Sequence, residues 1–298
     1  MMPSFIRRAL AIAATAAGER PAEIDRSPRY AFLGDHTGMV RLASGDKLFV
    51  DTRDRSLTPH LINSGRWEDH VSAIIRDLLR PGMIAIDVGA NVGYHALTAS
   101  RCVGANGRVI AFEPNPRLFA LLRDALPVNE IANVTLLPYA ASDRECEIEL
   151  IVSPDNMGGG AVALPDFDRD PNLRGYERHK AITKRLDDVV APSDAVGLIR
   201  SDAEGCDLAV LMGARRMLET SPNVAAIVEW GAFHMPSYYD VREGVARLSA
   251  LGFSFWRIEK DARLGPISAT QLPTQGLCDL LIMRPGAMPA AIQARRAG

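Results

Sequence analysis

The amino-acid sequence predicts an α/β protein with a doubly wound, mostly parallel, Rossmann-like sheet of seven strands and a small N-terminal β extension. Three observations support this prediction. Short apolar runs alternate with segments of helical periodicity, which is typical of parallel sheets with right-handed crossovers. A glycine-rich turn at residues 89–93 directly follows the first core run. Polar side chains, most of them acidic, stand at the ends of several of these runs.

The N-terminal part divides into two predicted segments. Residues 1–28 are expected to form a weak helix and linker, and residues 29–64 the β extension, with short strands at 30–33, 39–42 and 47–50. Arg7 and Arg8 precede an alanine-rich stretch that imitates a signal peptide, but Leu10 and Ile12 are its only strongly hydrophobic residues. A frayed helix is therefore the favoured reading, and targeting by residues 1–17 is left open.

The main domain is predicted to span residues 65–284, followed by a tail at 285–298 without a core pattern. Its first helix covers residues 68–79, where apolar residues recur at helical spacing. The predicted core strands lie at residues 83–88, 108–112, 134–137, 196–200, 224–228, 253–256 and 280–283. Helices are expected at residues 94–101, from 116 onward, at 186–188, after 205 and around 241–248. The motif at residues 202–205 is expected to cap the helix that follows it.

Two strand pieces, at residues 147–152 and 180–184, flank a long predicted loop. The loop contains Gly158, Gly159 and Gly160 and a charged stretch that runs to Arg178. A loop of this length in a compact domain is usually functional or disordered. We expect either a flexible linker or a lid over the ends of the strands.

The composition is that of an ordinary soluble globular protein. Of 298 residues, 47% are hydrophobic and 23% are charged, and the net charge of −2 gives no general attraction to nucleic acid or anionic membranes. No run approaches the ~18 apolar residues of a membrane span. The cysteines lack C-x-x-C spacing, which predicts reduced core thiols and a cytoplasmic location. They are Cys102, Cys146, Cys206 and Cys278. The oligomeric state is left open.

The segment from Asp87 to Glu113 carries a nucleotide-binding signature. Asp87 ends a strand, Gly89 and Gly93 form the following turn, and Glu113 ends the next strand, where it can accept hydrogen bonds from ribose hydroxyls. The turn lacks the G-x-G-x-x-G pattern of dinucleotide sites, and an acid at Asp87 would repel a pyrophosphate. A ligand with a ribose, an ammonium group and no phosphate fits better. S-adenosylmethionine (SAM) is such a ligand.

The chain resembles the FkbM family of class I SAM-dependent methyltransferases from about Gly65 to Met283. The resemblance rests on GRWE at 65–68, DVGANVG at 87–93, FEPN at 112–115, LDD at 186–188, IRSDAEG at 199–205 and IVE at 227–229. It departs from the family at Arg200, where a lysine is usual, and at Asp207, where a glutamate is usual. The resemblance implies O-methylation of a hydroxyl on a sugar or glycan, a glycolipid or a secondary metabolite, with no nucleic-acid partner. The predicted cofactor contacts are Glu68, Asp87, Gly89, Ala90, Asn91, Gly93, Tyr94, Glu113, Asn115, Ser142 and Asp143.

Asp202 is the first candidate for a general base, because it ends the fourth strand and a sugar hydroxyl must lose a proton to become nucleophilic. Glu204 and His234 are weaker candidates. Arg200 cannot act as a base in the way a lysine could, so a catalytic part for this position is in doubt. Asp202, Glu204 and Glu229 could instead hold a divalent metal, although no metal is predicted. Trp230 is the tryptophan best placed to stack on a sugar.

Two other function classes stay open. A nicotinamide-dependent oxidoreductase shares the fold but needs the dinucleotide glycine pattern, and NADH binding without SAM binding would revive it. A non-catalytic SAM-fold module could act as a scaffold in a biosynthetic complex, but such a module would have lost the acids at the strand ends. This chain keeps those acids, which favours catalysis.

Overall fold

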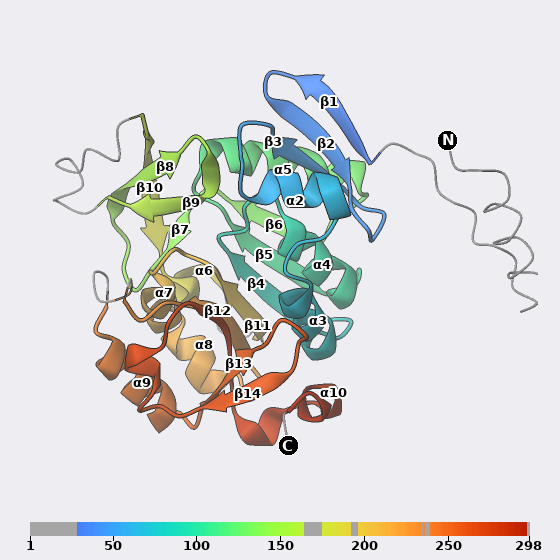
Figure 1. The fold of residues 1–298 in the computed structure, drawn as a ribbon. Helices are drawn as coiled ribbons and strands as arrows, with labels where there is room; N and C mark the ends of the chain where they lie inside the picture. Colours follow the sequence, from blue (N-terminus) through green and yellow to red (C-terminus); the bar gives the residue numbers. More distant parts are fainter. Residues whose placement is uncertain (1–28, 164–174, 192–195, 234, 236–238, 297–298) are drawn as a thin grey trace, which may run out of the picture.

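The computed structural model describes residues 29–163, 175–191, 196–233, 235 and 239–296. Its central sheet consists of β4 (Ile84–Val88), β5 (Arg108–Phe112), β6 (Val134–Leu137), β11 (Val196–Ser201), β12 (Ala225–Trp230), β13 (Ser254–Ile258), β14 (Leu264–Ile267) and β15 (Cys278–Met283). Their order is β14-β13-β15-β12-β11-β4-β5-β6 (Figure 1). Strands β12, β11, β4, β5 and β6 are parallel to one another, and β15 is inserted antiparallel between β12 and β13. The seven predicted strands are confirmed, and β14 is an additional edge strand.

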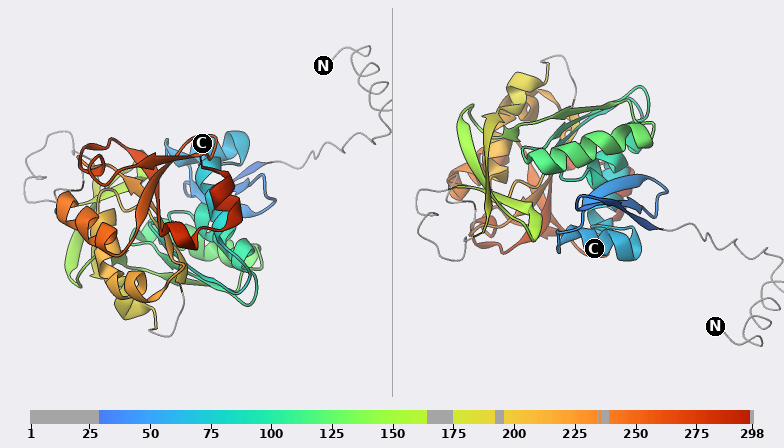
Figure 2. Two further views of the ribbon diagram at one scale, coloured as in Figure 1. Left: turned by 90° about the horizontal axis from the view of Figure 1, so that it is seen from below. Right: turned by 90° about the horizontal axis from the view of Figure 1, so that it is seen from above.

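Helices cover both faces of this sheet, as a doubly wound fold requires (Figures 1 and 2). One face packs against α3 (Asp69–Leu78), α4 (Tyr94–Val103) and α5 (Pro116–Val128). The other packs against α6 (Leu186–Val189), α7 (Asp207–Gly213), α8 (Arg215–Thr220) and α9 (Val241–Ala250). Successive side chains of a strand point to opposite faces, so Ala85 joins the first core cluster whereas Ile86 and Val88 join the second.

The N-terminal extension forms a separate antiparallel sheet of β1 (Tyr30–Gly34), β2 (Thr37–Arg41) and β3 (Lys47–Asp51). These strands match the three predicted segments. A helix, α2 (Leu57–Ser64), follows them and was not predicted. Its buried Leu57 and Leu61 are four residues apart, a signal that the short segment carries only once. The extension lies beside α5, which packs against β3 (Figure 1).

A third sheet, which we call the covering sheet, contains β7 (Ala140–Ala141), β8 (Glu147–Ser153), β9 (Asn156–Val162) and β10 (Glu177–Lys184), in the order β7-β10-β8-β9. The prediction of a loop at residues 156–162 is wrong, because β9 pairs antiparallel with β8. Glycines have low strand propensity, so the pairing is set by the partner strand rather than by this segment alone. The rest of the predicted loop, at 164–174, lies outside the described residues.

The C-terminal tail is folded, contrary to the prediction of a segment without a core pattern. Helix α10 (Ala290–Ala294) packs against α3, and both Met288 and Ile292 are buried. Two apolar residues four positions apart are too few to show a helical periodicity in the sequence. The four cysteines are unpaired as expected, but each is half-buried rather than in the core. In the part of the chain that the structure describes, no helix is long and apolar enough to cross a membrane.

Candidate active site

Four neighbouring strands of the central sheet end in acidic side chains. Asp87 lies near the end of β4, Glu113 follows β5, Asp202 follows β11, and Glu229 lies near the end of β12. Because these strands are parallel neighbours, their carboxyl ends meet at one edge of the sheet. The structure therefore brings together the acids that the sequence placed at strand ends.

A cavity lies at this edge, between the central sheet and the covering sheet. The covering sheet supplies an apolar wall that includes Ile148, Leu150 and Val162. The predicted site residues that line the cavity are Gly89, Glu113, Asn115, Ser142, Asp143, Asp202 and Glu204. The predicted cofactor contacts that do not line it are Glu68, Asp87, Ala90, Asn91, Gly93 and Tyr94.

The covering sheet approaches the glycine turn very closely at Gly158. A Cβ atom on Gly158 would lie 2.4 Å from Nδ2 of Asn91, so a larger residue would force the Asn91 side chain or the strand to shift. One residue earlier, the carbonyl of Met157 accepts a hydrogen bond from Nδ2 of Asn115 at 3.5 Å. The glycine run, read from the sequence as a linker or a lid, is thus part of the cavity wall.

The glycine turn is constrained by protein atoms on the sides where Cβ atoms would project. Gly89 and Gly93 have φ angles of 71° and 98°, which favour glycine. A Cβ on Gly89 would lie 2.0 Å from the carbonyl oxygen of Asp202, and one on Gly93 would lie 2.2 Å from Cδ1 of Leu122. We expected a bound cofactor to occupy this space. The structure corrects the reason, since the next strand end and helix α5 occupy it instead.

Glu113 joins the glycine turn to the start of α5. Its side chain is buried, with Oε2 accepting a hydrogen bond from the backbone N–H of Asn91 at 2.7 Å and Oε1 from that of Asn115 at 2.8 Å. Burial raises the pKa of Glu113 to about 7, although both hydrogen bonds oppose this shift. Each carboxylate oxygen keeps a second lone pair, so Glu113 can still accept hydrogen bonds from a ligand in the cavity.

Arg200 is the electrostatic centre of the site, and sequence reasoning did not assign it this part. Its guanidinium group lies 3.2 Å from Asp87, 2.7 Å from Asp202 and 3.9 Å from Glu68. It also donates a hydrogen bond to the carbonyl of Gly89 at 3.1 Å. A signal was present in the sequence, because Arg200 is a charge inside a buried strand, two residues before Asp202 and hence on the same side.

Glu68 binds protein groups rather than facing the cavity. It lies at the N-cap of α3 with φ 42°, and its carboxylate is 3.0 Å from Nε2 of His95. Burial opposes its charge, but the hydrogen bond and positive charge of His95, with Arg200 nearby, lower the pKa of Glu68 to about 2. Tyr94 stacks edge-on against His95 and is buried. These residues support Arg200 from the side of α3 and α4.

Asp202, Glu204 and Glu229 form a cluster of half-buried carboxylates whose oxygen atoms lie within 4.8 Å of one another. Burial, reinforced by the neighbouring acids, raises the pKa of Glu204 to about 7 and that of Glu229 to about 9. Burial also raises the pKa of Asp202, against the opposing charge of Arg200. The cluster can therefore hold a proton near neutral pH, or a divalent cation between three carboxylates.

The predicted cap at residues 202–205 is wrong in detail. Helix α7 begins at Asp207, and its N-cap residue Cys206 makes no side-chain capping bond. Asp207 instead accepts hydrogen bonds from Oγ of Ser201 at 2.6 Å and from the backbone N–H of Ala203 at 3.0 Å. Asp207 thereby ties the helix to the strand end and frees Asp202 and Glu204 to face the cavity.

The two remaining candidates are a tryptophan and a histidine. Trp230 is fully buried, and its Nε1 donates a hydrogen bond to the carbonyl of Leu272 at 3.0 Å. The suggestion that Trp230 stacks on a sugar is therefore wrong, since its indole ring is a core group. His234 lies outside the described residues, so its part as a candidate base remains a prediction.

Comparisons with known proteins identify the family of the chain. The methyltransferase FkbM domain model matches residues 87–255. A protein-L-isoaspartate O-methyltransferase from Methanopyrus kandleri is 38% identical over 94 residues, which cover 30% of this chain and 42% of that protein. The ribosomal RNA large subunit methyltransferase E of Azoarcus sp. is 33% identical over 98 residues, which cover 33% and 41% respectively. The chain thus matches less than half the length of these relatives.

Among solved structures, a methyltransferase FkbM from Methylobacillus flagellatus is similar over 76% of this chain and 52% of its own, with 17% identity and a TM-score of 0.43. A putative methyltransferase from Streptococcus mutans in complex with SAH covers 73% of this chain and 98% of its own, with 14% identity and a TM-score of 0.42. Because the FkbM model spans more than half of the sequence, the chain belongs to the FkbM methyltransferase family.

Proposed function

We propose that this protein is an O-methyltransferase that methylates a hydroxyl group of a sugar or glycan, a glycolipid or a secondary metabolite, within a domain spanning residues 65–284. The observation that carries the proposal is the position of Asp202. It lies beside the cavity that is lined by Glu113 and carries its own fixed counter-charge in Arg200. A carboxylate so placed suits an acceptor whose proton must be removed.

The cavity fits SAM in its donor and acceptor groups. Glu113 offers carboxylate lone pairs for the ribose hydroxyls, and Ser142 and Asp143 add polar groups farther along the same cavity. The wall from the covering sheet is apolar, as an adenine ring requires. When bound, SAM supplies a methyl group on a sulfonium leaving group, so the protein needs chiefly to orient the acceptor and remove its proton.

Asp202 is our proposed general base. Its Oδ2 atom is 2.7 Å from Nη2 of Arg200, which leaves Oδ1 to accept the proton of the acceptor hydroxyl. Glu204 lines the same cavity, and its pKa of about 7 suits it to receive that proton next. In an alternative arrangement, Asp202, Glu204 and Glu229 hold a divalent cation that binds the acceptor oxygen.

We propose a small-molecule or glycan acceptor rather than nucleic acid, even though one relative is named as a ribosomal RNA methyltransferase. The acidic cluster offers no positive charge to a phosphate backbone, and the net charge of −2 gives the chain no general attraction to nucleic acid. Hydroxyl groups, in contrast, donate hydrogen bonds to carboxylates. The four unpaired cysteines support a reducing compartment, for which we propose the cytoplasm.

The acceptor class is tested by incubating the protein with labelled SAM and extracts of its own producing cells. Transfer of label to a hydroxyl of a glycan, lipid or small metabolite, identified by mass spectrometry, is the expected result. Label that appears only in RNA or in protein would contradict the proposal.

The base is tested by Asp202→Asn, which keeps the shape of the side chain but removes its charge. We expect turnover to fall at least ~10²-fold, while SAM affinity stays within about twofold. Addition of EDTA to the wild type separates the two arrangements, because a direct base survives chelation and a metal site does not. Near-normal turnover in a folded Asp202→Asn enzyme would contradict both.

A further inference from the structure

The covering sheet is attached to the N-terminal extension at its outer end. Arg55 donates a backbone hydrogen bond to the carbonyl of Asp155 at 2.8 Å, and its guanidinium group lies 3.3 Å from the Asp155 carboxylate. Asp155 lies in the turn between β8 and β9. Arg53 lies 3.7 Å from the carboxylate of Glu177, the first residue of β10. Two arginines of one short segment therefore contact two separate points of the same sheet.

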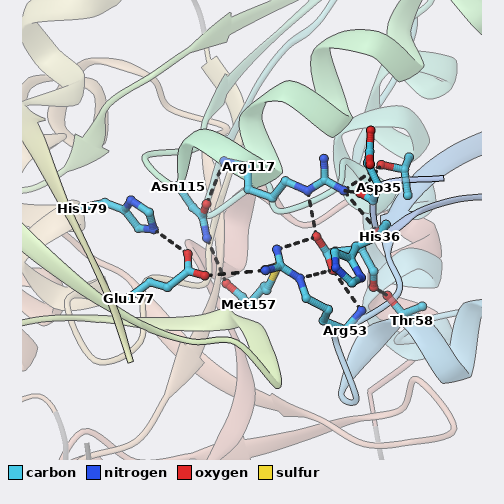
Figure 3. Close-up of polar contacts among 11 residues, drawn as sticks. Asp35, His36, Arg53, Thr58, Asn115, Arg117, Met157, Glu177 and His179 are labelled. Carbon is cyan, nitrogen blue, oxygen red and sulfur yellow. Dashed lines mark hydrogen bonds and ion pairs between the residues drawn. The ribbon is translucent and has the colours of Figure 1, made fainter. Parts of the chain in front are cut away.

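The attachment begins at Asp51 in the N-terminal extension, and this inner end is held rigidly. This carboxylate is 1% exposed. Its Oδ1 accepts hydrogen bonds from the backbone N–H and Nε of Arg53, and its Oδ2 accepts from Nη2 of Arg53 and Nε of Arg117. The remaining terminal nitrogen of Arg53 points toward Glu177 (Figure 3). A buried carboxylate thus fixes the arginine that reaches the covering sheet.

The same carboxylate also holds the start of α5, which borders the cavity. Arg117 binds Asp51 through Nε at 2.8 Å, and its backbone N–H donates to Oδ1 of Asn115 at 2.9 Å. Asn115 in turn contacts the carbonyl of Met157 in β9 (Figure 3). The extension is therefore connected to both sides of the cavity, to helix α5 through Arg117 and to the covering sheet through Arg53.

The two ends of the attachment differ in strength. At the inner end, Asp51 is buried and bonded to two arginines. At the outer end, the paired side chains of Arg53 and Glu177 are 35% and 42% exposed, and those of Arg55 and Asp155 are 79% and 57% exposed. Exposed ion pairs are weak and screened by salt. The attachment should therefore open at the outer end, where the covering sheet meets the arginines.

We propose that residues 51–55 are a latch that holds the covering sheet closed over the cavity, and that Arg53 and Arg55 set the rate at which SAM enters and leaves. This inference rests on the proposed binding of SAM in this cavity. Opening breaks the same contacts, the two ion pairs and the backbone hydrogen bond from Arg55 to Asp155, whether or not SAM is bound. Weakening the latch therefore accelerates association and dissociation by the same factor and leaves the Kd unchanged.

The test compares the full-length wild type with the double variant Asp155→Asn/Glu177→Gln, which removes the two exposed ion pairs and keeps the bonds between Arg53 and buried Asp51. The matched control is Arg215→Ala/Arg247→Ala, which removes two exposed ion pairs, to Glu219 and Glu243, on helices α8 and α9. Dissociation is measured by chasing labelled SAM from the complex with excess unlabelled SAM, and the Kd by calorimetry. Each exposed pair accounts for about 1.4- to fivefold in rate, so the double variant should dissociate about 2- to 25-fold faster.

A rise in both rate constants with a Kd within twofold of the wild type supports the latch. In the wild type, raising NaCl from about 0.05 to 0.5 M should accelerate dissociation, and the double variant should lose this response. An unchanged dissociation rate would overturn the proposal. A Kd that rises in step with the dissociation rate would also overturn it, because the ion pairs would then only support the folded site.

A measurement without SAM separates failure of the latch from failure of the cofactor assignment. Hydrogen exchange of backbone amides in residues 147–162 should be faster in the double variant than in the wild type. Slow exchange in both proteins would overturn the latch itself. Faster exchange with unchanged SAM dissociation would overturn the role in cofactor exchange and place the fault in the assignment of SAM to this cavity. If this variant does not fold, Arg53→Ala/Arg55→Ala removes the same two pairs from the other side, together with the bonds from Arg53 to Asp51.

Discussion

Replacement of Arg200 by methionine tests whether this side chain is the counter-charge on which the site depends. The substitution keeps an unbranched side chain but removes the guanidinium group that contacts Asp87, Asp202 and the carbonyl of Gly89. The side chain of Asp87 is 3% exposed, so water cannot replace the lost partner. Removal of one member of a buried ion pair costs about 3–5 kcal/mol. We expect a loss of this size in the free energy of unfolding at pH 8.

The loss should depend on pH in a defined direction. Burial already raises the pKa of Asp202, and without the opposing charge of Arg200 this pKa rises further, so the folded variant binds a proton more tightly than the unfolded chain does. Stability of the variant then falls as pH rises. The gap to the wild type should be largest near pH 8 and smaller near pH 5. Urea unfolding followed by circular dichroism at both pH values measures it.

Arg200→Lys is the matched control, because the resemblance to the family gives lysine as the usual residue at this position. It keeps the charge but presents a single ammonium group instead of a planar fork. It should recover most of the lost stability. An Arg200→Met protein within about 1 kcal/mol of the wild type at pH 8 would refute the reasoning, as would an Arg200→Lys protein no more stable than Arg200→Met.

Three further predictions concern single residues. The affinity of the wild type for SAM should rise between pH 6 and 8, because Glu113, with its pKa of about 7, ionises in this range. Glu113→Gln should abolish this pH dependence and weaken SAM binding by about 1–3 kcal/mol at pH 8, as measured by calorimetry. Gly93→Val should destabilise the fold by about 2–6 kcal/mol, because φ is positive at this position and the new side chain would meet Leu122. A variant of native stability that fails to bind SAM would contradict this prediction. Asp51→Asn should cost about 3 kcal/mol at pH 7 in urea unfolding. Burial raises the pKa of Asp51, but hydrogen bonds from Arg53 and Arg117 outweigh it and lower this pKa, so the contribution of Asp51 starts to be lost as pH falls below about 4. A gap that does not narrow below that pH would contradict the assignment.

The acids at the strand ends could be placed from sequence because a parallel sheet brings the carboxyl ends of its strands to one edge. Once residues 83–88, 108–112 and 196–200 are identified as neighbouring parallel strands, Asp87, Glu113 and Asp202 must lie at one edge. No knowledge of side-chain packing is needed for that step. The central strands and the convergence of these three acids were accordingly predicted correctly.

The surroundings of those acids could not be predicted, because they depend on contacts between segments distant in sequence. Strand β9 forms against β8 despite three consecutive glycines, and Gly158 comes close to Asn91, 67 positions earlier. Trp230 follows Glu229 directly, yet the alternation of a strand sends its ring into the core. Local pattern identifies the strand but does not reveal which neighbour will cover it.

Arg200 also limits which groups can receive the proton of the acceptor hydroxyl. A lysine at this position could exchange a proton with Asp202, but arginine stays charged at any pH at which the protein is folded. If Asp202 is the base, as we propose, its proton must therefore pass to another carboxylate or to water. Glu204, with a pKa of about 7, can receive it near neutral pH, whereas Glu229, with a pKa of about 9, already holds a proton there. The substitution of arginine for the usual lysine thus assigns proton handling to the acidic cluster and leaves position 200 the task of holding Asp202 in place.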